Sequence, residues 1–80
     1  MEPSTKVSRT LDCTGLLCPS PIVELSKAIK GVTVGEVIEM LATDPGSVPD
    51  MEAFGTQTGH EVFGRSEANG VFRFLVRRTR

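Results

Sequence analysis

The chain has 80 residues, of which 39% are hydrophobic and 24% charged, with a formal net charge of −1 at pH 7. This length allows one small domain, and the composition is that of a soluble globular domain, which excludes a disordered tail. No window is apolar enough to cross a bilayer, so we expect no membrane insertion. The first residues lack the basic start and apolar run of a secretory signal. We therefore expect a cytoplasmic monomer whose two cysteines stay reduced.

A first strand and a first helix are predicted in the N-terminal part of the chain. After residues 1–5, which we expect to be flexible, apolar and polar residues alternate over 6–12, as is typical of a short strand. Pro19 and Pro21 fall in the first turn of the next segment, where a missing backbone N–H costs nothing in a helix. An apolar stripe then continues to Gly31, so this helix is expected to end near residue 30.

A buried strand and a second helix are predicted next. The run 36–42 carries apolar residues on both faces, as a central strand does. The sequence Asp44-Pro45-Gly46-Ser47 ends this strand and offers a side-chain cap for a helix over 48–58, and Gly59 is placed to end that helix.

The last part of the chain predicts a β-hairpin. Strands over 60–67 and 71–78 flank Asn69-Gly70, a dipeptide suited to a two-residue turn because both central residues need a positive φ. Alternation in the last strand places its phenylalanines on the core face and its arginines outward. The resulting order, βαβαββ, predicts an α/β (α+β) two-layer sandwich with a four-stranded mixed sheet covered on one face by two helices. We expect it to form a single domain over 6–80.

The charged residues are distributed unevenly. Residues 36–67 contain seven acids and one base, whereas the last ten residues contain four arginines (Arg73, Arg77, Arg78 and Arg80) and no acid. Such a tail could contact an acidic partner or a phosphate backbone. We interpret the arginines first as the solvated ends of an outer strand, and second as a docking surface for an acidic face of a partner protein.

Cys18 is the candidate reactive residue, because the run Leu16-Leu17-Cys18-Pro19-Ser20-Pro21 places its thiol at a helix N-terminus. With Cys18 as the cap residue, Pro19 and Pro21 donate no N–H, which leaves the Ser20 N–H as the nearest backbone donor for the sulfur. This donor and the partial positive charge of the helix end favour the thiolate, so we expect a lowered pKa for Cys18. The two proline rings predict a rigid first turn beneath an exposed sulfur.

At these residues the chain resembles the TusA-like (SirA-like) sulfur-carrier family, and the resemblance covers residues 7–78. It rests on the following motifs in this order: Leu11-Asp12, Gly15-Leu16, Cys18-Pro19-Ser20-Pro21, Asp44-Pro45 and Gly59-His60-Glu61. The resemblance implies a two-layer sandwich whose Cys-Pro-x-Pro cysteine, here Cys18, accepts a sulfane sulfur as a persulfide. Pro19, Ser20 and Pro21 would support that site.

The resemblance also implies partner proteins. The donor would be a cysteine desulfurase or a rhodanese-like protein, and the acceptor would be the next protein in a sulfur relay. The exchange follows thiol–disulfide logic and needs no metal or organic cofactor. The molecule would then be a sulfurtransferase that acts as a persulfide carrier and not as a self-contained enzyme.

Two interpretations of Cys13 remain open at the sequence level. It is either a small apolar residue at a strand end, or a resolving thiol that forms a disulfide with Cys18 and makes the protein a dithiol redox module. A metal site is not expected, because two cysteines and the lone His60 supply at most three protein ligands. His60 is interpreted as a partly exposed residue at a strand start.

A further alternative is an RNA-associated binding module, suggested by the C-terminal arginines. The net acidic charge and the absence of Trp and Tyr argue against it, and the four phenylalanines are expected to lie largely in the core. We therefore expect no stable nucleic-acid binding.

Overall fold

The structure, a computed structural model, describes residues 6–80, which form four strands and two helices. In chain order these are β1 (Val7–Cys13), α1 (Ser20–Ile29), β2 (Val37–Ala42), α2 (Ser47–Thr58), β3 (Glu61–Ala68) and β4 (Val71–Arg77). The predicted βαβαββ order is confirmed, and the predicted element ends differ from these by no more than one residue. Residues 1–5, for which flexibility was expected, lie outside the described residues.

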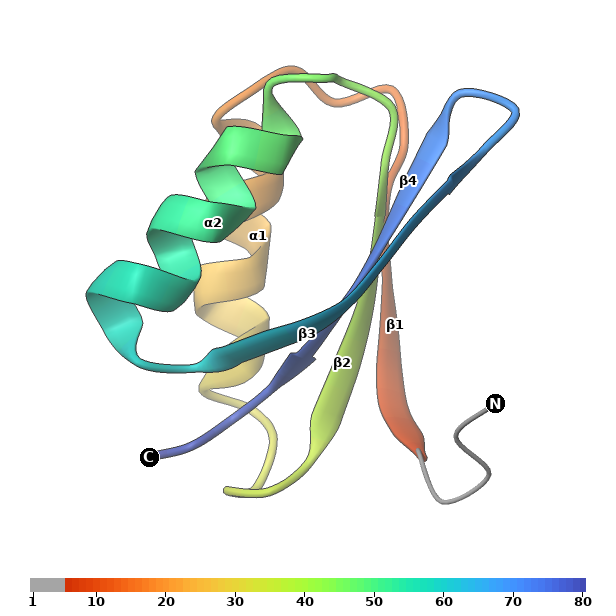
Figure 1. The fold of residues 1–80 in the computed structure, drawn as a ribbon. Helices are drawn as coiled ribbons and strands as arrows, with labels where there is room; N and C mark the ends of the chain where they lie inside the picture. Colours follow the sequence, from red (N-terminus) through yellow and green to blue (C-terminus); the bar gives the residue numbers. More distant parts are fainter. Residues whose placement is uncertain (1–5) are drawn as a thin grey trace.

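The strands form one mixed sheet in the order β1-β2-β4-β3, with both helices on the same face (Figure 1). β1 and β2 are parallel, and the other two neighbouring pairs are antiparallel. The parallel register pairs Cys13 with Ala42, the last residue of each strand. The loops that follow β1 and β2 therefore leave the sheet at the same end, and this brings two distant segments of the sequence together.

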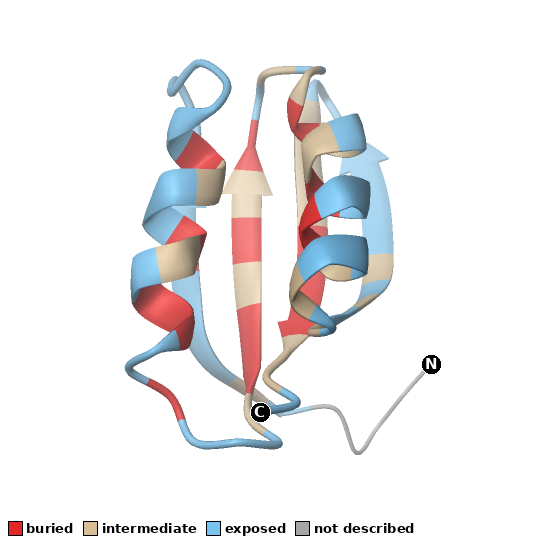
Figure 2. Ribbon diagram, turned by 90° about the vertical axis from the view of Figure 1, so that its left-hand side faces the viewer, coloured by how far each residue is buried: buried red, intermediate tan, exposed pale blue. Residues whose placement is uncertain are grey.

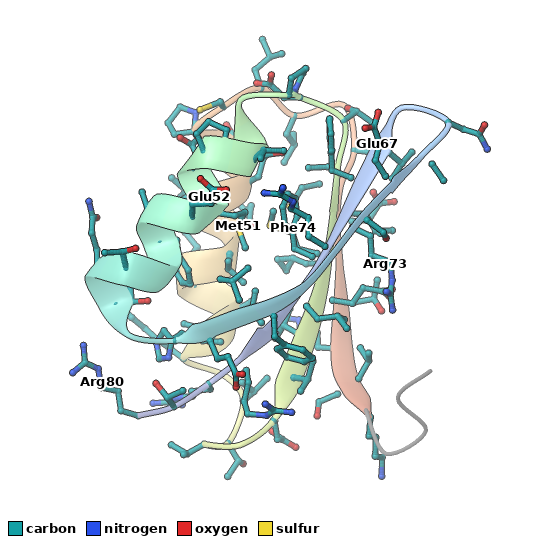
Figure 3. The ribbon with its side chains drawn as sticks, in the orientation of Figure 1. Met51, Glu52, Glu67, Arg73, Phe74 and Arg80 are labelled. Carbon is teal, nitrogen blue, oxygen red and sulfur yellow. The ribbon has the colours of Figure 1, made fainter. Side chains whose placement is uncertain are left out.

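The hydrophobic core lies between the sheet and the two helices, and Figure 2 shows the buried residues on the inward sides of the helices and on the middle strands. Met51 of α2 and Phe74 of β4 face each other across this layer (Figure 3). Leu25 of α1 is fully buried in the same cluster. No helix within residues 6–80 is long and apolar enough to span a membrane.

The structure corrects the interpretation of the last strand as an outer strand. β4 is central, paired with β2 on one side and with β3 on the other. The hairpin turn at Asn69-Gly70 is present, with Asn69 at φ 55° and Gly70 at φ 80°, but a hairpin alone does not decide which of its two strands joins the rest of the sheet. That choice depends on the contact between β2 and β4, whose paired residues range from Ala42 and Phe72 to Val37 and Arg77, far apart in the sequence.

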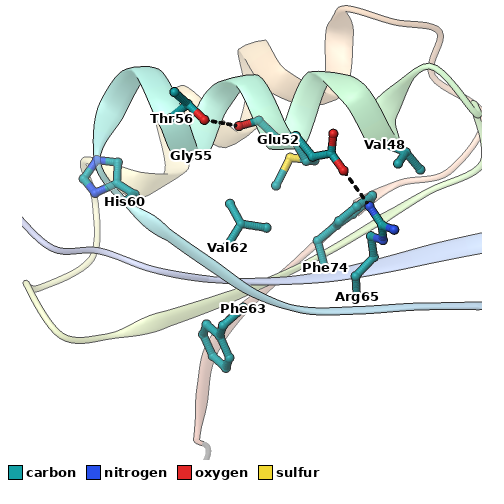
Figure 4. Close-up of a pocket in the computed structure, with 10 residues that line it drawn as sticks. Val48, Glu52, Gly55, Thr56, His60, Val62, Phe63, Arg65 and Phe74 are labelled. Atoms are coloured by element: carbon teal, nitrogen blue, oxygen red, sulfur yellow. Dashed lines mark hydrogen bonds and ion pairs between the residues drawn. The ribbon is translucent and has the colours of Figure 1, made fainter.

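The outer face of the sheet carries ion pairs instead of a free cationic surface. Arg73 pairs with Glu39, and Arg77 pairs with Glu61 at 2.6 Å. The guanidinium of Arg77 also lies 4.6 Å from the centroid of the Phe63 ring. Phe63 is 36% exposed, so the expectation of a core position is wrong for this phenylalanine, because Val62 takes the helix-facing position beside it (Figure 4).

The last two arginines contact the carboxyl ends of the helices. Arg78 donates hydrogen bonds to the carbonyl oxygens of Lys30 (3.5 Å) and Val32 (2.5 Å), just after α1. Arg80, near the end of α2 in Figure 3, donates to the carbonyl oxygen of Thr58 at 2.5 and 3.0 Å. These arginines cap helix ends, where unpaired carbonyl groups and a partial negative charge favour a cation.

Candidate functional site

Two loops build the site at the carboxyl ends of β1 and β2. The loop over 14–19 leads into α1, the loop over 43–46 leads into α2, and they lie side by side in Figure 1. Two hydrogen bonds join them: the Gly15 N–H donates to Oγ1 of Thr43 at 2.9 Å, and the Cys18 N–H donates to Oδ2 of Asp44 at 2.6 Å. The second loop therefore holds the backbone of the candidate cysteine in place.

The helix start differs from the prediction by one residue. The N-cap of α1 is Pro19, and Cys18 lies just outside the helix. The Ser20 N–H donates to the Leu17 carbonyl oxygen at 2.8 Å, so it is not available to the sulfur as was expected. Pro21 is fully buried and anchors the first turn of α1 in the core.

The Cys18 side chain is exposed, and its thiol donates a hydrogen bond to Oδ2 of Asp50. Asp50 belongs to the first turn of α2, 32 residues further along the chain. The site thus combines a thiol from the first loop with carboxylates from the second loop and the second helix.

The pKa of Cys18 is raised, and the predicted lowering is wrong. The first cause is the hydrogen bond to the Asp50 carboxylate, followed by partial desolvation and by the negative charges of Asp50 and Asp44. A carboxylate that accepts the thiol proton stabilises the protonated form, and nearby negative charge disfavours the thiolate. This arrangement therefore favours the protonated form of the Cys18 thiol.

Asp44 joins the two loops, and the side-chain cap that the run 44–47 was expected to offer the second helix is absent. The N-cap of α2 is Gly46, which makes no side-chain cap hydrogen bond. One oxygen of Asp44 accepts from the Gly46 N–H at 3.1 Å, and the other accepts from the Cys18 N–H. These two hydrogen bonds lower the pKa of the Asp44 carboxyl, because both N–H groups favour its charged form.

Cys13 lies in the hydrophobic core, with only 1% of its surface exposed. Burial is the first cause of its raised pKa, followed by the negative charges of Glu24 and Asp12. Both cysteines are free thiols in this structure. The position suits a small apolar side chain at the end of a strand, the first of the two interpretations of this residue.

His60 is partly buried and away from the thiol. Its Nδ1 accepts a hydrogen bond from the Thr79 N–H at 3.1 Å, and its ring stacks on Phe54 with centroids 6.0 Å apart. Burial lowers its pKa, and the charges of Arg78 and Arg80 lower it further. His60 therefore connects the end of β4 to α2, in keeping with a structural role.

A surface groove of about 530 Å³ lies elsewhere, between α2 and β3 (Figure 4). Met51, Val62 and Phe74 supply its apolar lining, and the Glu52–Arg65 ion pair (3.0 Å) crosses its rim. Cys18 does not line it. Across residues 6–80, no three His, Cys, Asp or Glu side chains gather in a group that could hold a metal ion.

The sequence analysis named Cys18 as the candidate reactive residue but did not place Asp50 beside it. Asp44 was noted only as part of an Asp-Pro motif within the run expected to cap the second helix, and Asp50 was noted only as one of several acids. The signal that could have indicated both residues is topological: two parallel strands bring their following loops together, so short polar residues after each strand become neighbours.

The fold and the site define a class of protein: a small two-layer α/β protein that exposes one thiol between two loops at the carboxyl ends of paired parallel strands. The family model described as Sulfurtransferase TusA matches residues 9–78, and the chain belongs to this family. The family resemblance stated from the sequence motifs is thereby confirmed.

Two relatives and one solved structure illustrate the similarity. The chain is 44% identical to the sulfur carrier protein TusA of Allochromatium vinosum over 86% of this chain and 91% of that protein. It is 38% identical to the sulfur carrier protein TusA of Pseudomonas entomophila over 86% of each chain. The crystal structure of a SirA-like protein from Desulfitobacterium hafniense matches with a TM-score of 0.78 at 22% identity, covering 90% of this chain and 99% of that one. This last match confirms the predicted two-layer fold.

Proposed function

We propose that this protein is a sulfur carrier in which Cys18 receives a sulfane sulfur as a persulfide and passes it to an acceptor protein. One observation carries the assignment to this residue: Cys18 has the exposed thiol, whereas Cys13 is buried in the core. Membership of the TusA family and the names of its relatives support the sulfur-carrier role.

The transfer is an exchange between sulfur atoms. Sγ of Cys18 attacks the outer sulfur of the donor persulfide, a new S–S bond forms, and the S–S bond of the donor breaks. The electron pair of the broken bond leaves with the inner sulfur of the donor, which takes up the proton that Cys18 has lost. A thiol and a persulfide exchange roles, so the reaction has no net oxidant or reductant and the protein acts as a carrier and not as a self-contained enzyme.

The surroundings of Cys18 favour a protein as the substrate. Leu17, directly before the cysteine, is 75% exposed, and Leu16 is 37% exposed. Exposed apolar residues beside a reactive group are typical of a contact surface. The partners would be a donor that carries a persulfide, such as a cysteine desulfurase or a rhodanese-like protein, and an acceptor with a mobile cysteine. Pro19, Ser20 and Pro21 support the site by fixing the chain behind Cys18.

The alternative, a dithiol redox module, requires Cys13 to reach Cys18. The buried position of Cys13 disfavours it, because the core residue would have to leave its packing for the disulfide to form. This alternative therefore ranks second, and a mass measurement separates the two functions.

The test is intact-protein mass spectrometry after incubation with polysulfide, or with a cysteine desulfurase and cysteine. We expect the wild-type protein and Cys13→Ala to gain one sulfur atom that dithiothreitol removes, and Cys18→Ser to gain none. Circular dichroism checks that each variant is folded. Gain of sulfur by Cys18→Ser would overturn the assignment, and loss of two hydrogens that requires both cysteines would establish the dithiol module instead.

A further inference from the structure

The carboxylate of Asp50 is committed to the Cys18 thiol. Asp50 lies in the first turn of α2, where an acidic side chain normally interacts with the free N–H groups of its own helix. Here its Oδ2 accepts the S–H hydrogen bond from Cys18 across the gap between the two helix starts. Among the described residues, 6–80, Asp50 forms no ion pair with Lys or Arg, so no base of this part of the chain neutralises the charge that faces the thiol.

The end of the molecule that carries Cys18 is acidic. The segments 10–24 and 39–61, which supply both loops and the first turns of both helices, contain no Lys or Arg. The charged groups that face the thiol are Asp50 from α2 and Asp44 from the second loop, and the first turn of α1 contributes no acid. A partner that docks on this end therefore meets an exposed apolar residue, Leu17, beside two carboxylates.

Resting on the proposed carrier function, we propose that Asp50 is a latch on the carrier thiol: it holds the Cys18 proton until a cationic side chain of the docked partner pairs with its carboxylate. The thiolate is the nucleophile in sulfur exchange, so a thiol held in its protonated form is poorly reactive towards oxidants and stray disulfides. Pairing of Asp50 with a Lys or Arg of the partner removes both the acceptor for the proton and the repulsion against the thiolate.

The proton balance of the latch follows from the exchange itself. When the partner cation occupies Asp50, the proton of Cys18 passes to water, and Sγ attacks the outer sulfur of the donor persulfide. The inner sulfur of the donor leaves with the electron pair and takes a proton from water. The partner thus needs two features in one surface, a persulfide and a cation within reach of α2.

The first test measures the rate of Cys18 alkylation by iodoacetamide, a neutral reagent, as a function of pH in a Cys13→Ala background. We expect Asp50→Asn to move the midpoint of the profile to lower pH and to raise the rate at pH 7 severalfold, because the amide keeps the shape of the side chain without its charge. The matched control is Glu52→Gln, which removes the same charge from the same helix at a residue paired with Arg65. Its profile should coincide with that of the background protein.

The second test replaces the partner by two small disulfides, cystamine, which is dicationic, and hydroxyethyl disulfide, which is neutral. We expect the ratio of their reaction rates with Cys18 to be severalfold higher in the background protein than in Asp50→Asn, with Glu52→Gln unchanged. The two reagents differ in their leaving groups, but this difference affects every variant equally. It therefore cancels when the cystamine-to-hydroxyethyl disulfide rate ratio of one variant is compared with that of another.

Unchanged pH midpoints and unchanged rate ratios in Asp50→Asn would overturn the latch. A shift of the same size in the pH midpoint of Glu52→Gln would also overturn it, because the loss of any negative charge from α2 would then explain the result without the contact between Asp50 and Cys18. Sulfur loading of the same variants, measured by mass, is a separate readout. A protein that loads sulfur on Cys18 without responding to Asp50→Asn refutes the latch alone, whereas a protein that loads no sulfur on Cys18 refutes the carrier function.

Discussion

At the residue scale, the reactivity of Cys18 depends on direct contacts more than on the helix that follows it. The interaction with a helix dipole falls off within the first turn and is screened by solvent at an exposed site. Cys18 lies one residue outside the N-cap of α1, and its thiol is in direct contact with the Asp50 carboxylate. The contact with the carboxylate therefore outweighs the dipole, which explains why the sequence pattern alone predicts the wrong sign for the pKa.

His60 supplies a prediction at the same scale. Its lowered pKa means that the folded state resists protonation, whereas the unfolded chain takes up a proton below a pKa of about 6.5. The folded state then binds fewer protons, so its stability falls as the pH drops below that value. Protonation would also remove the acceptor for the Thr79 N–H.

We expect the free energy of unfolding of the wild-type protein to approach that of His60→Gln as the pH falls from 7 to 5. The glutamine variant keeps a neutral polar side chain but does not titrate in this range. Both proteins contain the same Asp and Glu residues, so the effect of their titration cancels in the difference between the two unfolding free energies. Urea unfolding followed by circular dichroism at three pH values measures the difference. A difference that stays constant, or grows, over this range would show that the pKa of His60 is not lowered by folding.

At the element scale, the C-terminal segment ties the two helices to the sheet. Arg78 reaches the carbonyl groups after α1, and Arg80 reaches the last carbonyl of α2. Because these contacts lie at the carboxyl ends of the helices, they are at the opposite end of the helices from Cys18 (Figure 1). The arginine-rich tail therefore has an internal role, and this weakens the interpretation of it as a docking or nucleic-acid surface.

Arg78→Ala is expected to lower the free energy of unfolding by about 1–2 kcal/mol, because it removes a charged hydrogen-bond donor from carbonyl groups at a helix end. The matched control is Lys27→Ala, which removes a base from the last turn of α1. The Lys27 ammonium lies 3.9 Å from the Glu24 carboxylate in an exposed ion pair. That change should fall within about 0.5 kcal/mol of zero. Chemical denaturation measures both variants, and equal losses would contradict the capping role.

At the scale of the whole molecule, one core supports both the fold and the position of the thiol. The same cluster contains Cys13 at the end of β1, Leu25 on α1 and Met51 on α2. The elements that carry Cys18 and Asp50 are therefore held by shared packing, and loss of the core should loosen the site together with the fold.

Leu25→Ala tests how much this core contributes to the stability of the fold. Leu25 is fully buried, so its truncation should cost about 2–5 kcal/mol of unfolding free energy, a large share for a domain of this size. Val23→Ala, on the same helix at a side chain that is 46% exposed, should stay within about 0.5 kcal/mol of zero. Urea unfolding measures both variants. A small loss for Leu25→Ala would mean that α1 is not packed on the sheet as described.

The sequence by itself determined the order and the bounds of the elements, the hairpin turn and the identity of the exposed cysteine, because these depend on local periodicity, turn chemistry and helix signals. It also indicated the family through the motif that begins at Cys18. Only the tertiary structure decided that β4 is central, that Asp50 contacts Cys18 and that the arginines pair within the chain. The physical reason is that these features arise from contacts between residues far apart in the sequence, and local patterns carry no information about which distant charges become neighbours.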